Sequence, residues 1–174
     1  MTNRTRNIII IALGVLIALC IGITVWAVFF RDTGEPPIPP DYPPQGEDEG
    51  QEPIEGDNSN KIESPTGGGG YNMTYNTMAT ASLTSGTVTL WYANPNASNQ
   101  NVAILIMIDD MVVAKSELIL PGNQITSLKL EDYAKGKLQA GGYDATLVVR
   151  AYDPVSGEKA MVEGNGNLTL VVTE

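Results

Sequence analysis

The order of apolar and polar residues divides the chain into three segments with different patterns. The first segment, residues 8–30, is a run of 23 residues without a charge. As an α-helix it would be about 35 Å long, and the hydrocarbon core of a bilayer is roughly 30 Å thick. The run therefore predicts one transmembrane helix over residues 8–30. Residues 31–70 are polar, and from residue 71 apolar and polar residues alternate in short runs, which is typical of β-strands.

The charges beside the apolar run predict its orientation. Arg4 and Arg6 precede the run, whereas Arg31 is followed at once by Asp32 and Glu35. The positive-inside rule then places residues 1–7 in the cytoplasm and everything after residue 31 outside it. We expect a protein of the cell membrane that crosses the bilayer once and has an extracytoplasmic C-terminal domain.

Cys20 offers a different interpretation, because a cysteine at the end of a cleaved signal peptide can carry a lipid. Two features favour an uncleaved anchor. Leu19 stands where lipoprotein signals have a small residue. The apolar run is also longer than the roughly 7–15 residues of a signal peptide. We therefore expect Cys20 to be an apolar residue within the bilayer.

Small residues recur every four positions in the predicted membrane helix. Gly14, Ala18 and Gly22 would lie on one face and would let a second helix approach closely. This spacing predicts a contact between two membrane helices, which would make the chain a homodimer. The alternative is a stripe with no partner helix, because glycine and alanine are common in membrane helices.

Residues 31–70 contain eight of the eleven prolines and end in four glycines, Gly67 to Gly70. Ten acidic residues stand against Arg31 and Lys61, which gives this segment a net charge of −8. Such a composition buries too little apolar surface to offset the entropy lost on ordering. We predict a disordered, proline-rich, acidic stalk with a glycine hinge.

The third segment, residues 71–174, predicts an all-β domain. Short runs rich in β-branched residues are separated by turn residues such as Asn, Asp, Pro and Gly. Seven strands in about 100 residues indicate a two-sheet sandwich of the immunoglobulin-like type. The predicted strands are residues 75–83, 87–92, 101–108, 111–120, 124–130, 143–152 and 160–172.

One local pattern carries a resemblance to a known fold. Leu138 lies five residues before Tyr143, where the sixth strand begins. This resembles the tyrosine corner of immunoglobulin-like and fibronectin-like sandwiches, in which the phenol hydroxyl binds the preceding loop. The combination of "ANPNASNQNVAILIMIDD", "LPGNQITSLKL", "GGYDATLVV" and "AYDPVSGEKA" is similar to small, uncharacterised, single-pass membrane-anchored sandwich proteins of Gram-positive bacteria. That resemblance covers residues 87–172 and implies a fold and a location, without an activity.

The residue types exclude several classes of chemistry. The chain has no histidine, and its one cysteine is Cys20, so histidine-dependent triads and the usual zinc ligands are absent. A net charge of −10 disfavours nucleic acid as a partner. Asp109 and Asp110 are acidic neighbours that predict a hairpin turn, with calcium ligation as the alternative. We therefore expect no enzyme activity, no metal and no cofactor.

Strand alternation predicts a surface for a protein partner. Leu105 and Met107 on the third strand, and Val148 and Tyr152 on the sixth, would form an outward apolar strip beside Arg150. The alternative is that other parts of the chain cover the strip.

Trp91 predicts a second kind of surface. If Val88, Leu90 and Tyr92 point inward, Trp91 points outward, where an indole ring can anchor a partner or stack on a sugar. Two functions follow from these surfaces. The first is a non-enzymatic, membrane-tethered module for protein interaction or structure in the cell envelope. The second is a carbohydrate-binding module that uses Trp91.

Overall fold

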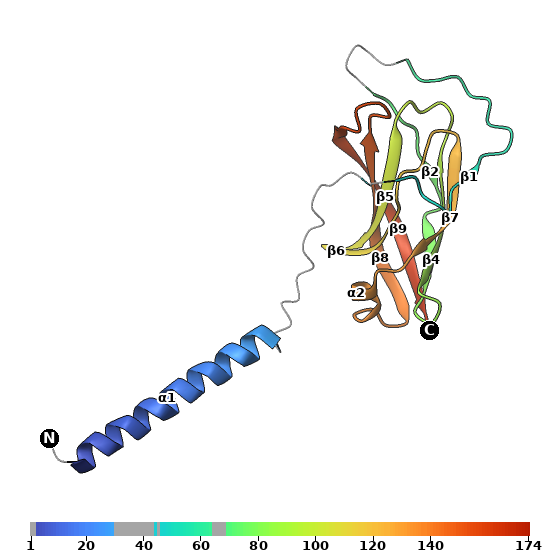
Figure 1. Cartoon of the computed structure of the whole chain (residues 1–174). Helices are drawn as coiled ribbons and strands as arrows, with labels where there is room; N and C mark the ends of the chain where they lie inside the picture. The colour runs from blue at the N-terminus through green and yellow to red at the C-terminus, as the bar shows by residue number, and fades with distance from the viewer. Residues whose placement is uncertain (1–2, 30–43, 45, 64–68) are drawn as a thin grey trace. The chain divides into compact units, whose positions relative to one another are not determined.

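A computed structural model describes residues 3–29, 44, 46–63 and 69–174, without the side chains of residues 3, 7–11, 25–29 and 162. The chain forms two compact units, Met1–Glu35 and Pro36–Glu174 (Figure 1). We call them the helical unit and the β-unit.

The helical unit contains α1 (Asn3–Phe29). Its described large apolar side chains are between 53% and 65% exposed, at positions 13, 15, 16, 17, 19, 21 and 23. Within the part of the chain that the structure describes, we find no helix with both the length and the hydropathy needed to cross a membrane. The predicted span over residues 8–30 extends at both ends beyond the described side chains, and it stays a prediction.

The β-unit contains nine strands and one short helix among the described residues. Strands begin or end within three residues of the predicted bounds in most cases, and the third strand has the predicted bounds. The prediction missed β1 and α2, and it merged β2 with β3. The elements are β1 (Glu52–Pro53), β2 (Thr74–Tyr75), β3 (Met78–Ser82), β4 (Thr87–Asn94), β5 (Asn101–Ile108), β6 (Met111–Lys115), β7 (Asn123–Lys129), α2 (Asp132–Lys135), β8 (Gly141–Tyr152) and β9 (Lys159–Thr173).

The strands form one curled sheet in the order β1-β7-β4-β3-β9-β8-β5-β6, with β2 paired to β4 (Figure 1). β3 joins the two halves because it pairs antiparallel with β4 and parallel with β9. The halves, β4 with β7 and β5, β6, β8 with β9, divide the strands as an immunoglobulin-like sandwich does. The all-β prediction is confirmed, as is the predicted neighbourhood of the third and sixth strands, β5 and β8. The prediction of two separate sheets is wrong because of the double pairing of β3.

The core lies inside the curl and follows the period of two that strands impose. In β4, Val88, Leu90 and Tyr92 are all at most 1% exposed. Ile104 in β5 and Leu147 in β8 are fully buried against them in one cluster. The predicted inward faces of these strands are therefore confirmed.

Two glycines in β9 make room for tyrosines that enter the core from the start of the domain. A Cβ on Gly164 would lie 2.6 Å from the Tyr71 hydroxyl, and one on Gly166 would lie 2.1 Å from the Tyr75 hydroxyl. Both glycines keep regular pairing with β8, Gly164 opposite Val149 and Gly166 opposite Leu147. Their role is to let the phenol rings pass close to the backbone.

Residues 46–62, which we call the strap, lie along the β-unit. The Asp48 amide donates a hydrogen bond to the Leu118 carbonyl (2.8 Å), and the Ile54 amide donates to the Gly122 carbonyl (2.8 Å). Between these contacts β1 pairs with β7. The strap thus covers part of the β7 edge, whose backbone groups would otherwise be unpaired. The prediction of a disordered stalk over residues 31–70 is wrong for the strap; residues 31–43, 45 and 64–68 lie outside the described residues.

The end of the strap binds the loop of residues 95–100 between β4 and β5. The Asn96 amide donates to the Asp57 carboxylate (2.6 Å), and the Ile62 amide donates to the Ala97 carbonyl (2.7 Å). Hydrogen bonds from the Ser59 hydroxyl and then from the Asn96 amide hold the pKa of Asp57 below its usual value. These bonds join polar groups, so a hydropathy pattern does not reveal them.

Candidate functional site

The predicted apolar strip is not an open surface. Leu105, Val148 and Tyr152 are 5%, 8% and 2% exposed. Leu105 and Val148 form a small second cluster with Val112 of β6, and Met107 packs against that cluster. Met107 pairs directly with Val112 across the β5–β6 ladder, so β6 supplies part of the cover. The expectation that this strip is accessible to a partner is wrong.

Arg150, predicted to flank the strip, belongs to an ion-pair network. Its Nε lies 2.9 Å from the Glu163 carboxylate, and Lys159 Nζ lies 2.7 Å from the same carboxylate oxygen. The hydrogen bond from Lys159 is the main cause that lowers the pKa of Glu163, and the charge of Arg150 adds to it. The network links β8 to β9, so the role of Arg150 is to connect these two strands.

The predicted tyrosine corner is present. The Tyr143 hydroxyl donates to the Gln139 carbonyl (3.0 Å) and accepts from the Gln139 amide (3.1 Å). Leu138, the other residue of the predicted motif, is 7% exposed and belongs to the core. The two bonds hold the loop before β8, and the residue that binds the Tyr143 hydroxyl is Gln139, which follows Leu138.

Trp91 points away from the core, as the alternation of β4 predicted. Its indole nitrogen donates a hydrogen bond to Gln124 Oε1 of β7 (2.9 Å). Its backbone carbonyl accepts from the Asn76 amide (3.0 Å). Trp91 lies where the register between β4 and β7 shifts, between Thr89 and Tyr92. One hydrogen bond therefore holds the ring of Trp91 and another holds its backbone.

Trp91 lines an open hollow of ≈ 540 Å³ on the outer face of β3, β4 and β7. Beside Trp91 the lining combines threonine hydroxyls and an asparagine amide with apolar surface, which includes the 62% exposed side chain of Met78, and none of the described lining residues is ionisable. The other residues at this hollow are Asn76, Thr77, Met78, Thr80, Thr89, Leu90 and Thr126. Sequence reasoning found Trp91 and missed the threonines, although the alternation of Thr87 and Thr89 with buried Val88 and Leu90 was a signal for an outward hydroxyl face.

A second hollow of ≈ 580 Å³ lies on the outer face of β8 and β9. It contains the carboxylates of Asp109 and Asp144 among threonine hydroxyls and an asparagine amide. Asp109 has a φ of 51° in the two-residue connection between β5 and β6, so the predicted hairpin turn is confirmed. Among the residues that the structure describes, no three acidic, cysteine or histidine side chains come together as metal ligands.

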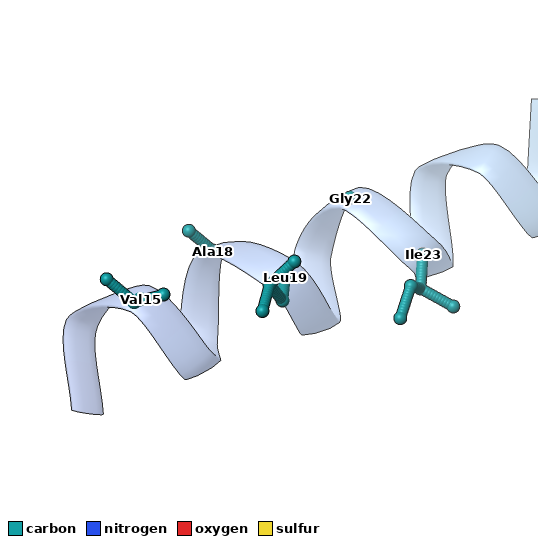
Figure 2. Close-up of a pocket in the computed structure, with 5 residues that line it drawn as sticks. All are labelled: Val15, Ala18, Leu19, Gly22 and Ile23. Atoms are coloured by element: carbon teal, nitrogen blue, oxygen red, sulfur yellow. The ribbon is translucent and has the colours of Figure 1, made fainter. Parts of the chain in front are cut away.

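The small-residue stripe of α1 leaves open space beside the helix. Figure 2 shows Ala18 and Gly22 between the larger side chains of Val15, Leu19 and Ile23. A Cβ on Gly14 or on Gly22 would meet nothing within 4 Å. A second helix on this face stays a prediction.

Comparison with known proteins gives no family for the chain. No protein-family model matches it, and no curated protein matches it. One similar solved structure is AggA, the major subunit of aggregative adherence fimbriae type I from Escherichia coli, with 10% identity, a TM-score of 0.33, and coverage of 64% of this chain and 100% of AggA. Another is the periplasmic chaperone SfaE, with 14% identity, a TM-score of 0.34, and coverage of 59% of this chain and 56% of the chaperone. At these TM-scores neither likeness carries an argument about this chain.

Proposed function

We propose that the chain is a non-enzymatic, membrane-tethered module of the cell envelope that presents its β-unit outside the cytoplasm for protein interaction or for structure. The observation that carries the proposal is the division of the chain into a helix that is uncharged and almost wholly apolar over residues 8–29 and a separate unit with its own core. A helical segment that is apolar on all sides has no polar face for water. An apolar surrounding is therefore the environment that suits residues 8–29 of α1.

The charge asymmetry around the apolar run supports the orientation. Two arginines precede residues 8–30, and two acidic residues follow within five positions. Such an asymmetry favours a cytoplasmic N-terminus. The apolar run also has the length that one crossing requires. In this orientation residues 8–30 contact the lipid, and all residues from 31 onward lie outside the cytoplasm.

The surface of the β-unit supports a binding or structural role. In the described part of the β-unit, the exposed large apolar side chains are Met78 (62%), Val155 (95%) and Met161 (102%). Val155 and Met161 flank the start of β9, at the tip of the β8–β9 hairpin. Exposed apolar side chains lose unfavourable hydration when a protein partner covers them. This hairpin tip is the place on the β-unit where we expect such a partner.

Reporter fusions at Glu174 test the topology. Alkaline phosphatase, which needs an oxidising compartment, should be active when fused there, and a green fluorescent protein that folds only in the cytoplasm should stay dark. A matched control exchanges the charges with Arg4→Glu, Arg6→Glu, Asp32→Lys and Glu35→Lys, which should reverse both signals. Bright fluorescence with inactive phosphatase in the unchanged chain would contradict the proposed orientation.

Photo-crosslinking in the native membrane tests the binding role. A photoreactive residue in place of Val155 or Met161 should give one defined crosslinked protein. The same residue in place of Thr173, at the other end of β9, is the control and should not give that product. Equal products at all three positions would count against a partner at the hairpin tip.

A further inference from the structure

We propose that the Trp91 hollow on the outer face of β3, β4 and β7 is a binding site for a neutral saccharide. This inference goes beyond the proposed tether and does not depend on it. It rests on the position of one indole ring and on the chemistry of the groups around that ring.

The indole ring is prepared for stacking. The bond from Trp91 Nε1 to Gln124 Oε1 (2.9 Å) satisfies its one polar group, and the bond from Asn76 to the Trp91 carbonyl (3.0 Å) holds the backbone. A side chain that is already fixed loses little conformational freedom on binding. The ring is also partly accessible although its neighbours Leu90 and Tyr92 are buried. Its π-face carries negative partial charge, to which the polarised C–H groups of a sugar ring are attracted.

The surrounding groups suit hydroxyls. Thr80 and Thr89 face each other directly across the β3–β4 ladder. Thr126 approaches from β7 on the opposite side of the hollow. A threonine hydroxyl both donates and accepts hydrogen bonds, as does a sugar hydroxyl. The hollow thus offers a row of matching partners beside the ring.

The charge of the lining selects the class of sugar. No acidic or basic side chain among the described residues lines this hollow, in contrast to the hollow on β8 and β9, where Asp109 and Asp144 are present. A uronic or sialic acid would lose hydration of its carboxylate without gaining a partner of opposite charge. An apolar peptide would leave the threonine hydroxyls unpaired. A neutral saccharide avoids both costs.

The test uses the full chain in lipid nanodiscs, because detergents with glucoside or maltoside headgroups are themselves saccharides. The probes are the pentasaccharides of β-glucose, β-mannose, β-xylose, α-glucose and N-acetylglucosamine, with oligogalacturonate as the charged comparison. Saturation-transfer NMR reports which probe contacts the protein. We expect at least one neutral probe to bind with saturation and oligogalacturonate not to bind. Absence of binding by all five neutral probes, or equal binding by oligogalacturonate, would overturn the proposal.

Three variants place the bound probe. Trp91→Ala should weaken binding at least tenfold, and Thr126→Val, which replaces the hydroxyl with a methyl group at the same shape, should weaken it severalfold. Thr146→Val, on β8, which β9 separates from β3, lies outside the lining of this hollow and should leave binding unchanged. Thermal unfolding of each variant shows whether it is folded, and Thr126→Val keeps the test decisive if Trp91→Ala unfolds. Unchanged binding in folded Trp91→Ala would overturn the proposal, as would equal losses in Thr126→Val and Thr146→Val.

Discussion

At the residue scale, Gly166 shows how a missing side chain supports the core. A Cβ there would lie 2.1 Å from the hydroxyl and 2.6 Å from Cζ of Tyr75, whose ring packs against the core. We predict that Gly166→Ala lowers the free energy of unfolding by about 1–3 kcal/mol, because the ring must move out of a packed position. Denaturant unfolding of the isolated β-unit measures this change.

A glycine of the neighbouring strand β8 provides the control for Gly166→Ala. A Cβ on Gly142 in β8 would meet nothing within 4 Å, so Gly142→Ala adds a methyl group to open space. Alanine also loses less backbone freedom than glycine on folding. Gly142→Ala should therefore leave stability unchanged or raise it slightly. Equal losses from both substitutions would mean that the contact with Tyr75 is not the cause.

The Tyr143 hydroxyl makes two hydrogen bonds with the backbone of Gln139, and the ring is half-buried. Tyr143→Phe removes both bonds while it keeps the ring. Because water can still reach these backbone groups, we predict a loss of about 0.5–1.5 kcal/mol in the free energy of unfolding. Faster amide exchange at Gln139 should accompany the loss. If Tyr143→Phe has the same free energy of unfolding as the unchanged protein, the two hydrogen bonds orient the loop without stabilising the fold.

The carboxylate of Glu163 predicts a dependence of stability on pH. Hydrogen bonding by Lys159 and the charge of Arg150 place its folded pKa below the ordinary value of 4.5. A lowered pKa means that the unfolded chain binds a proton more readily, so the stabilisation is present above pH 4.5 and is lost as the pH falls through the folded value. Glu163→Gln should therefore flatten the acid limb of a plot of unfolding free energy against pH. An unchanged acid limb would show that the ion pairs of Glu163 do not contribute to the free energy of unfolding.

At the scale of elements, the strap is part of the β-unit. Its backbone bonds to Leu118 and Gly122, its pairing with β7 and its contacts with the loop of residues 95–100 all cross to the rest of the fold. Removing the strap removes all of these contacts and exposes the β7 edge that it covers. We therefore predict that residues 71–174 alone have a free energy of unfolding at least about 1 kcal/mol lower than residues 36–174, as measured by denaturant unfolding.

A substitution within the strap separates its contacts from chain length. Asp57→Ala in residues 36–174 removes the acceptor for the Asn96 amide (2.6 Å) and keeps every other strap residue. Amide exchange should become faster at Asn96 and stay unchanged in the centre of β8. Glu55→Ala, at an exposed position in the same strap, is the matched control. If residues 71–174 and residues 36–174 have the same free energy of unfolding, the strap contacts the domain without stabilising it.

The sequence predicted elements well where side chains carry the information. Strands such as β5 and β8 are apolar runs bounded by turn residues, so their bounds could be derived closely, and the alternation of side chains along a strand gives the inward face. The strap could not be derived, because its contacts use backbone groups and short polar side chains, which composition assigns to disorder. The strip around Leu105 and Val148 was misjudged because alternation gives the face of a residue but not what covers that face.

At the scale of the whole molecule, the pairing of β5 with β8 could be predicted, but the joining of the two halves into one sheet could not. The pairing of β5 with β8 follows from the immunoglobulin-like order that the tyrosine corner suggested. The joining of the two halves depends on β3, which is five residues long and pairs with both β4 and β9. Nothing in the residues of β3 indicates two partners, since hydrogen bonds to either side use the same backbone. The Trp91 site was predictable only at Trp91, because its hydroxyls come from three separate strands.

The division into two units makes a prediction about folding. Among the described residues, the core cluster of the β-unit begins at Tyr71, and the strap together with Gly70 supplies further contacts from the N-terminal side. Residues 36–174 therefore hold all the described interactions of the β-unit. We predict that this fragment and the full chain in nanodiscs have the same unfolding midpoint within about 2 °C, a shift below that caused by 1 kcal/mol in a domain of this size. Calorimetry measures both, and Gly166→Ala should lower the midpoint equally in each. A full chain that melts well above the fragment would show that the helical unit stabilises the β-unit, and the two would then have to be treated as one folding unit.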